Sequence, residues 1–261
     1  MRFSTQSHRG GSIMEWLAAL GGGAFVLVSL VVGIRLLLLA RRTRQLPEFV
    51  MGGALLVMGG IGYPATAIAR GGEALDPTVR GAIAGFALVC QAVGIAGLAT
   101  FTARVFRADQ RIATLGAWTL GLLALATVVT DGALSGFHGA VQNVGLPMRG
   151  NEALAGLVLG WCTVESFLYH SKLKRRVKLG LASPVVANRI RLWGIGSLFA
   201  MLLNWISQVA AWNGIDVATS ALGAGLVGAL GPIAAGSVWL AFFPPASYVR
   251  RIERAAEATN G

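Results

Sequence analysis

The sequence predicts an all-α integral membrane protein, built as a seven-transmembrane helix bundle. Of its 261 residues, 55% are hydrophobic and only 13% are charged, and the mean hydropathy is +0.66. Long apolar stretches take up nearly the whole chain and leave no room for a separate soluble domain. The stretches are continuously apolar, whereas the strands of a membrane barrel alternate over roughly 10 residues. Helices are therefore expected throughout.

Each apolar stretch is long enough to cross about 30 Å of hydrocarbon as a helix. The predicted spans are residues 13–39, 49–69, 80–103, 112–130, 152–171, 185–210 and 217–243. They define a transmembrane domain over 13–245, between a flexible N-terminus at 1–12 and a short basic tail at 246–261. The first stretch is too long for the apolar core of a signal peptide, so we expect it to remain in the mature protein.

Residues typical of helix ends agree with these spans. Pro47 precedes the second span and Ser183–Pro184 the sixth, where a proline loses no hydrogen bond and a serine can cap. Asn151 is expected to start the fifth span in the same way. Pro244–Pro245 ends the seventh span. Residues 248–256 then form either a short basic helix along the inner membrane surface or a solvated tail.

Lysine and arginine are distributed unevenly between the two sides of the predicted bundle. Sixteen of the 22 follow spans 1, 3, 5 and 7, five lie on the other side, and Arg35 lies within span 1. Positively charged flanks remain cytoplasmic. The N-terminus is therefore expected outside and the C-terminus in the cytoplasm, in a multi-pass protein of the cell membrane such as a bacterial inner membrane.

The net charge of +11 does not indicate a nucleic-acid partner, because the basic residues form short clusters between apolar spans. The densest cluster follows span 5 and consists of Lys172, Lys174, Arg175, Arg176 and Lys178. We expect it to contact anionic lipid headgroups of the bilayer. A docking surface for a cytoplasmic or membrane protein partner is the alternative.

The two halves of the chain correspond weakly to each other. Each has an apolar span, a basic run and a span opened by proline: RRTRQLPEF follows span 1 and KRRVKLGLASPVV follows span 5. Spans 1 and 5 run in the same direction. The pattern predicts a 3+1+3 parallel repeat in which span 4 is the connector.

Glu165 is an acidic residue at hydrocarbon depth, about 14 residues or roughly 20 Å below the outer end of span 5. A charge at this depth needs a partner or a proton. Arg35 is the nearest partner by depth, with Arg189 or Arg191 as others, and Tyr169 lies one turn away. This intramembrane charge network is either a functional site or an interhelical lock near the inner surface.

A second group of polar and aromatic side chains gathers toward the outer half of the bundle. Its members are Tyr63, Gln91, Asp131, Asn204, Trp205 and Gln208. Amide and phenol groups at this depth must form hydrogen bonds inside the bundle, because lipid offers none. They predict an outward-opening ligand pocket, with structural bonding between helices as the alternative. The outer connector over 132–150 is either a mobile lid over this pocket or a flexible loop.

Catalytic and metal-binding motifs are absent from the sequence. It contains no phosphate-binding loop, zinc-protease motif or nucleophile elbow, so no enzymatic activity is expected. His138 has no histidine, cysteine or carboxylate at ligand spacing, which argues against a metal site. The G-x-G-x-x-G run at 223–228 lies inside span 7 and indicates close helix packing. Cys90 and Cys162 lie inside spans as small buried side chains.

Seven spans with an external N-terminus resemble rhodopsins and receptors in topology. A retinal Schiff base requires a lysine amine in the core of the bundle. The lysines of this chain, Lys172, Lys174 and Lys178, all follow span 5. Retinal is therefore excluded, no cofactor is expected, and the resemblance is limited to topology.

Three functions are compatible with these features. The first is a ligand-binding sensor or receptor-like module, in which the outer pocket biases helix packing and the basic inner connector contacts a partner. The second is a small-solute transporter with alternating access, favoured by the repeat and by the kinking residues Pro64 and Pro232. The third is a structural or accessory subunit of a membrane complex.

Overall fold

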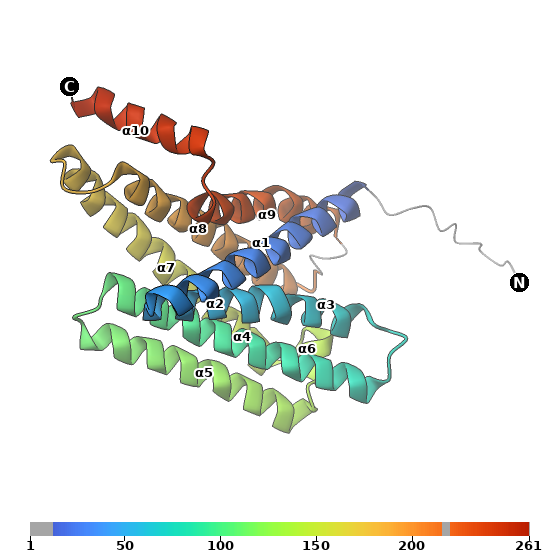
Figure 1. Cartoon of the computed structure of the whole chain (residues 1–261). Coiled ribbons are helices and arrows are strands. Elements are labelled where there is room, and N and C mark those ends of the chain that lie inside the picture. Colours follow the sequence, from blue (N-terminus) through green and yellow to red (C-terminus); the bar gives the residue numbers. More distant parts are fainter. Residues whose placement is uncertain (1–12, 216–219, 261) are drawn as a thin grey trace, which may run out of the picture.

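The computed structural model describes residues 13–215 and 220–260, and every regular element in these residues is a helix (Figure 1). The elements are α1 (Ile13–Thr43), α2 (Leu46–Ala54), η1 (Leu55–Gly62), α3 (Tyr63–Gly71), α4 (Pro77–Phe106), α5 (Arg111–Ser135), α6 (His138–Gln142), α7 (Leu146–Lys178), α8 (Pro184–Trp212), α9 (Ala221–Phe242) and α10 (Ala246–Asn260). Element η1 is a π-helix that joins α2 to α3 without a break.

Within the described residues, six helical segments are long and apolar enough to cross a membrane. They are Ala19–Thr43, Leu46–Gly71, Pro77–Phe106, Arg111–Ser135, Pro184–Trp212 and Gly223–Phe242. The protein is therefore an all-helical, multi-pass membrane protein. The predicted fifth span corresponds to α7, which has 33 residues but is less apolar than the six. Its lower hydropathy follows from Glu152, Glu165 and a basic last turn.

Proline sets several helix starts, as expected from the sequence. Pro47 lies in the first turn of α2, and α8 begins at Pro184 after Ser183. Helix α7 begins earlier than expected, at Leu146 with Pro147 in its first turn. Asn151 therefore lies inside the helix with a fully buried side chain, and the prediction that it starts a helix is wrong.

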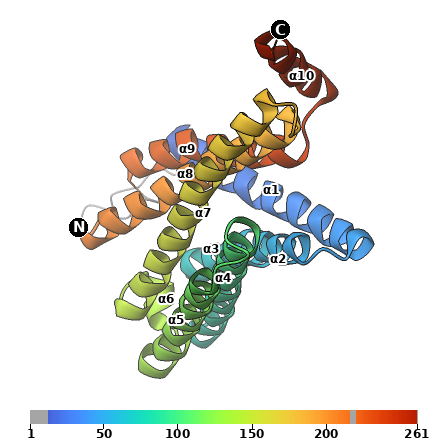
Figure 2. The same ribbon diagram turned by 90° about the vertical axis from the view of Figure 1, so that its left-hand side faces the viewer.

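The helices form two groups that α7 connects. Helix α4 packs against α2, η1 and α3 on one side and against α5 on another. Helix α8 packs between α7 and α9, and α9 packs against α1. Figure 2 shows the α2–α5 group nearly end-on, with α7 leading from it to α8 and α9. Helix α1 crosses between the groups, because it also contacts α2 and η1 (Figure 1).

The bundle has one strongly basic end. The α1–α2, α4–α5 and α7–α8 turns and helix α10 all lie at the same end of the bundle, on the left of Figure 1. They carry the basic clusters at 41–44, 104–111, 172–178 and 250–254. We call this end the basic end, and the opposite end, where α1 begins, the cavity end. The four basic clusters that are separate in the sequence therefore lie together at one end of the folded protein.

Glycine lets α1 approach two neighbours closely. A Cβ on Gly21 would lie 2.6 Å from the carbonyl oxygen of Val227 in α9. A Cβ on Gly33 would lie 2.9 Å from the backbone nitrogen of Leu56 in η1. Only a residue without a Cβ permits these backbone contacts. Helix α1 is therefore held to α9 near its start and to η1 farther along.

The outer connector predicted at 132–150 is folded rather than irregular. It contains α6 and the first turn of α7. The Asp131 carboxylate accepts a hydrogen bond from the backbone N–H of Ala140 at 3.3 Å. Arg70 donates to the Asn143 side chain at 2.9 Å. These bonds hold α6 against the bundle, so the connector contains regular structure.

Helix α10 leaves the bundle after Pro244–Pro245 and touches it near its start. The Asn188 amide of α8 donates to the Tyr248 hydroxyl at 3.0 Å. The side chains of Val249, Ile252 and Ala256 are half-buried, while Arg250, Arg251 and Arg254 are exposed. The tail is therefore helical and amphipathic, as expected for a short basic helix.

Candidate functional site

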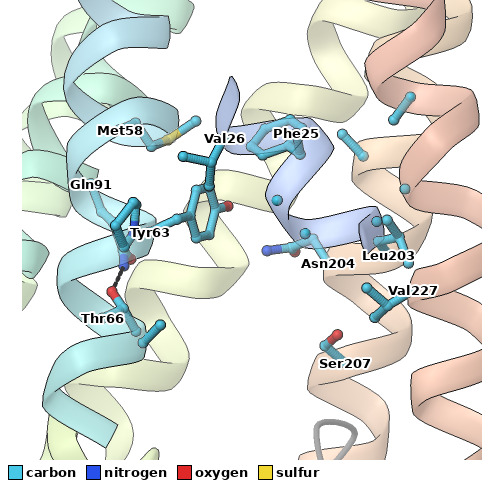
Figure 3. Close-up of a pocket in the computed structure, with 18 of the residues that line it drawn as sticks. Phe25, Val26, Met58, Tyr63, Thr66, Gln91, Leu203, Asn204, Ser207 and Val227 are labelled. Atoms are coloured by element: carbon cyan, nitrogen blue, oxygen red, sulfur yellow. Dashed lines mark hydrogen bonds between the residues drawn. The ribbon is translucent and has the colours of Figure 1, made fainter. Parts of the chain in front are cut away.

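A cavity of about 760 Å³ lies between the two helix groups, in the half of the bundle toward the cavity end (Figure 3). Residues of α1, η1, α3, α4, α7, α8 and α9 form its walls. Its volume lies in the range of small-molecule binding sites, about 300–1,000 Å³. The walls come from segments that are distant in sequence, so the cavity exists only in the folded bundle.

Most of the cavity wall is apolar. Helices α1 and α9 contribute aliphatic side chains and glycines, among them Val26, Leu27, Leu30, Val227 and Gly231. The Phe25 ring contacts the Tyr63 ring edge to face, with centroids 5.6 Å apart. This wall can contact an apolar ligand body without leaving polar groups unpaired.

The polar side chain at the base of the cavity is bonded into the protein. Gln91 donates to the Thr66 hydroxyl at 3.0 Å and accepts from the Asn151 amide at 2.8 Å. Thr127 in turn donates to Asn151 at 3.4 Å. Gln91 thus joins α3, α4 and α7, and these bonds use one of its two N–H donors and one of the two lone pairs on its oxygen.

Three polar groups on the cavity wall are available to a ligand. Figure 3 shows the Tyr63 hydroxyl and the Asn204 amide nitrogen pointing into the cavity from opposite sides. Ser207 lies one turn beyond Asn204 on the same wall. Among the described residues, no protein atom forms a hydrogen bond with the Tyr63 hydroxyl, the Asn204 nitrogen or the Ser207 hydroxyl. Polar groups in an apolar wall gain most from a ligand that bonds to them.

An ion pair at the edge of the cavity was missed by sequence reasoning. Arg70 of α3 and Glu152 of α7 both line the cavity, with Nη2 and Oε1 3.9 Å apart. Neither residue was among the predicted pocket residues. The sequence did contain a signal for this pair: Arg70 directly follows span 2 and Glu152 begins span 5, so both lie on the predicted outer side at similar depth. The charged side chains of the cavity wall are thus of opposite sign, and Arg149, outside the wall, also acts electrostatically on Glu152.

The six predicted pocket residues fall into two sets. Tyr63, Gln91 and Asn204 line the cavity. Gln208 is fully buried one turn from Asn204 and donates to its side-chain oxygen at 3.4 Å. Trp205 packs against Gly156, and Asp131 bonds to α6, as described above. The structure therefore places three of the six on the cavity wall and the others behind or away from it.

Glu165 is paired, but with a residue other than the expected ones. The Arg107 guanidinium donates to Oε1 of Glu165 at 2.8 Å and joins the end of α4 to α7. Arg35 instead donates to the carbonyl of Phe242 at 2.9 Å and lies 4.1 Å from the Phe243 ring centroid. The Tyr169 ring contacts Phe106 at 5.6 Å. The proposed Glu165–Arg35 contact is therefore replaced by a Glu165–Arg107 pair.

The basic cluster after span 5 lies at the end of α7. Its members, Lys172, Lys174, Arg175, Arg176 and Lys178, are all exposed. In the described part of the chain, no salt bridge involves any of the five. Their charge is thus presented to the surroundings of the basic end.

Comparison with known proteins returned no relative: no protein-family model, no curated protein and no solved structure matches this chain. Its function has to be argued from the cavity and its polar groups.

Proposed function

We propose that this protein is a ligand-binding sensor of the cell membrane, with seven transmembrane helices, an external N-terminus and a cytoplasmic C-terminus. The cavity binds a small molecule without chemical conversion or a cofactor. The observation that carries this proposal is the cavity itself, with the unpaired Tyr63 hydroxyl and Asn204 amide nitrogen facing each other inside it. Such groups on an otherwise apolar wall are typical of ligand sites.

The position of the cavity fits an outward-facing sensor. It lies toward the end opposite the basic clusters, and the positive-inside rule assigns the basic end to the cytoplasm. A ligand would then bind from outside while the basic cluster at 172–178 and α10 contact anionic lipid headgroups or a cytoplasmic partner. Helix α7 runs from Glu152 at the cavity to the basic cluster, so it links the two ends physically.

A second candidate, transport of a small solute by alternating access, is favoured by irregular helices beside the cavity. The π-helix η1 contains Met58 of the cavity wall and is followed directly by Tyr63 and Pro64. In α9, Pro232 lies inside the helix next to Gly231 of the wall. π-Helices and internal prolines weaken the regular hydrogen bonding and permit bending.

The contacts between helices are compatible with a parallel 3+1+3 repeat. In such a repeat α1 matches α7, the α2–α3 span matches α8, and α4 matches α9. The α1–α2 contact then corresponds to the α7–α8 contact, and the α1–α9 contact corresponds to the α7–α4 contact. All four contacts are present. Helix α5 packs against α4 and α7 at the edge, as a connector would. This arrangement supports the transporter alternative.

Ligand binding and transport are distinguished by two measurements on the purified protein. In nanodiscs, a panel of small molecules is tested for a rise in the thermal unfolding midpoint, which binding to the native state must produce. The Asn204→Leu variant should lose the shift, and Asn213→Leu, at the exposed end of the same helix, should keep it. Uptake of the same molecule into proteoliposomes would establish transport instead of sensing. If no molecule raises the midpoint and the protein co-purifies in a fixed ratio with another subunit, the accessory role replaces both.

A further inference from the structure

Helices α1 and α3 both line the cavity, and they contact each other only narrowly. The two helices touch where the Phe25 and Tyr63 rings meet. Beyond that point α1 packs against α9 through Gly21, whereas contacts between α1 and α3 are at most isolated. In Figure 1, α1 rises away from α3 toward the N-terminal end of α1. We call this region the wedge: α1 and α3 have almost no contacts here, and cavity-lining residues of both helices are exposed.

The side chains that border this wedge are apolar and exposed. On α1, Leu27 is 60% exposed although it lines the cavity, and Gly23 lines it as well. On α3, Ala67 lines the cavity and is exposed, and the adjacent Ile68 is 53% exposed. Tyr63 lies eight residues before the end of α3, which places the tip of the wedge about 12 Å along the helix from that end. At this depth an apolar side opening meets lipid acyl chains rather than water.

The polar groups inside select for an oxygen acceptor without charge. The Asn204 nitrogen is a donor, and the Tyr63 and Ser207 hydroxyls can donate or accept. Together they suit a hydroxyl, ester or carbonyl oxygen. The two charged side chains of the cavity wall, Arg70 and Glu152, pair with each other, so a charged headgroup would have to compete with this pair and would lose its hydration.

We propose that the ligand is an uncharged amphiphile, with an apolar body and an oxygen-bearing headgroup, that enters the cavity laterally from the bilayer between α1 and α3. The apolar body packs against α1 and α9, and the headgroup bonds to Asn204, Tyr63 and Ser207. This inference rests on the proposed function, since it names the ligand class and route of the same cavity.

The ligand class is tested with a thiol placed in the cavity. Both native cysteines, Cys90 and Cys162, are buried, which keeps background labelling low. The Ser207→Cys variant in nanodiscs is labelled with N-ethylmaleimide in the presence of monoolein, oleate or oleylamine at equal mole fraction. Monoolein should slow labelling by about fivefold or more, and the two charged amphiphiles should not. Equal protection by oleate or oleylamine would overturn the neutrality of the site.

The route is tested by narrowing the wedge. A Cβ on Gly23 has no atom within 4 Å, so Gly23→Trp can be accommodated and would obstruct the opening. Gly116→Trp on α5 is the matched control, because its Cβ is equally free. Gly23→Trp should slow both the onset and the release of monoolein protection by about tenfold, because the ligand enters and leaves through the obstructed opening. Unchanged rates would overturn lateral entry.

A second variant keeps the test of the route possible if Gly23→Trp does not fold. Ile68→Trp narrows the wedge from the α3 side at an exposed residue that does not line the cavity, so it should slow the onset and the release in the same way and leave the dissociation constant unchanged. If neither monoolein nor any other amphiphile protects the thiol while a water-soluble molecule of the panel does, this inference fails and the proposed binding function stands. If nothing binds at all, both fail.

Discussion

Arg107 Nε donates a 2.8 Å hydrogen bond to Oε1 of Glu165 and thereby ties the end of α4 to the middle of α7. Glu165 is almost fully buried, while about a third of the Arg107 side chain is exposed. The pair lies in the half of the bundle toward the basic end, far along α7 from the Glu152 edge of the cavity. It is therefore a contact between helices and takes no part in the cavity.

Breaking this pair should destabilise the protein without changing ligand binding. Glu165→Gln leaves a weaker hydrogen bond, and Arg107→Gln leaves a buried carboxylate without its partner. After allowance for the solvent exposure of Arg107, we expect each to cost about 1–2 kcal/mol in unfolding free energy. A double-mutant cycle measured in lipid nanodiscs should give a coupling energy; strictly additive losses would show that the pair does not interact.

Tyr63→Phe and Gln91→Leu should separate binding from stability. The Tyr63 hydroxyl has no protein partner within the described residues, so its removal should leave thermal stability nearly unchanged and weaken ligand binding about tenfold. Gln91→Leu instead leaves the buried Asn151 amide unpaired and should cost about 1–3 kcal/mol. Thermal unfolding and ligand titration of both variants check this. A stability loss in Tyr63→Phe comparable to that in Gln91→Leu would contradict the assignment of its hydroxyl to the ligand.

Two glycine substitutions test the packing of α1 on α9. Gly21→Ala forces a Cβ to within 2.6 Å of the Val227 carbonyl oxygen and should destabilise the bundle by about 1–3 kcal/mol. A Cβ on Gly236 of α9 meets nothing within 4 Å, so Gly236→Ala should stabilise the helix by up to about 1 kcal/mol. The opposite signs are the informative result, and unfolding of both variants in the same detergent measures them.

The start of α4 should depend on pH through Asp76. The backbone N–H of Thr78 donates to the Asp76 carboxylate at 2.8 Å, and that of Val79 donates at 3.4 Å. These bonds hold the pKa of Asp76 below its ordinary value, and the bond from Thr78 makes the largest contribution. The stabilisation is fully present above the pKa of the unfolded chain and is lost as pH falls through the lower pKa of the folded state.

Asp76→Ala should therefore lower the unfolding midpoint at neutral pH, and the difference from the native protein should shrink as the carboxyl becomes protonated. Asp76→Asn keeps an oxygen acceptor that does not titrate. Thermal unfolding of the three proteins from neutral pH to about pH 3 provides the comparison. A difference between the native protein and Asp76→Ala that is the same at every pH would contradict a contribution from the charged cap.

The fold could be largely predicted from the sequence because lipid imposes a strong constraint on it. A chain in hydrocarbon must satisfy its backbone hydrogen bonds within each segment, so long apolar runs become helices. Pro47 and Pro184 also predicted helix starts correctly, because a proline in the first turn of a helix loses no hydrogen bond. The basic clusters at one end of the bundle also follow from the order of spans and connectors.

The site was only partly predictable, since depth can be read from the sequence and rotation of a helix about its axis cannot. Tyr63, Asn204 and Gln208 were all placed at suitable depth, yet only the first two face the cavity. Glu165 pairs with Arg107 rather than with Arg35, because the packing of α7 against α4 brings Glu165 and Arg107 together. The divergence of α1 from α3 arises from glycine contacts with α9. Helical segments and their depth are properties of the local chain, whereas which faces meet and where a cavity remains depend on the packing of all helices at once.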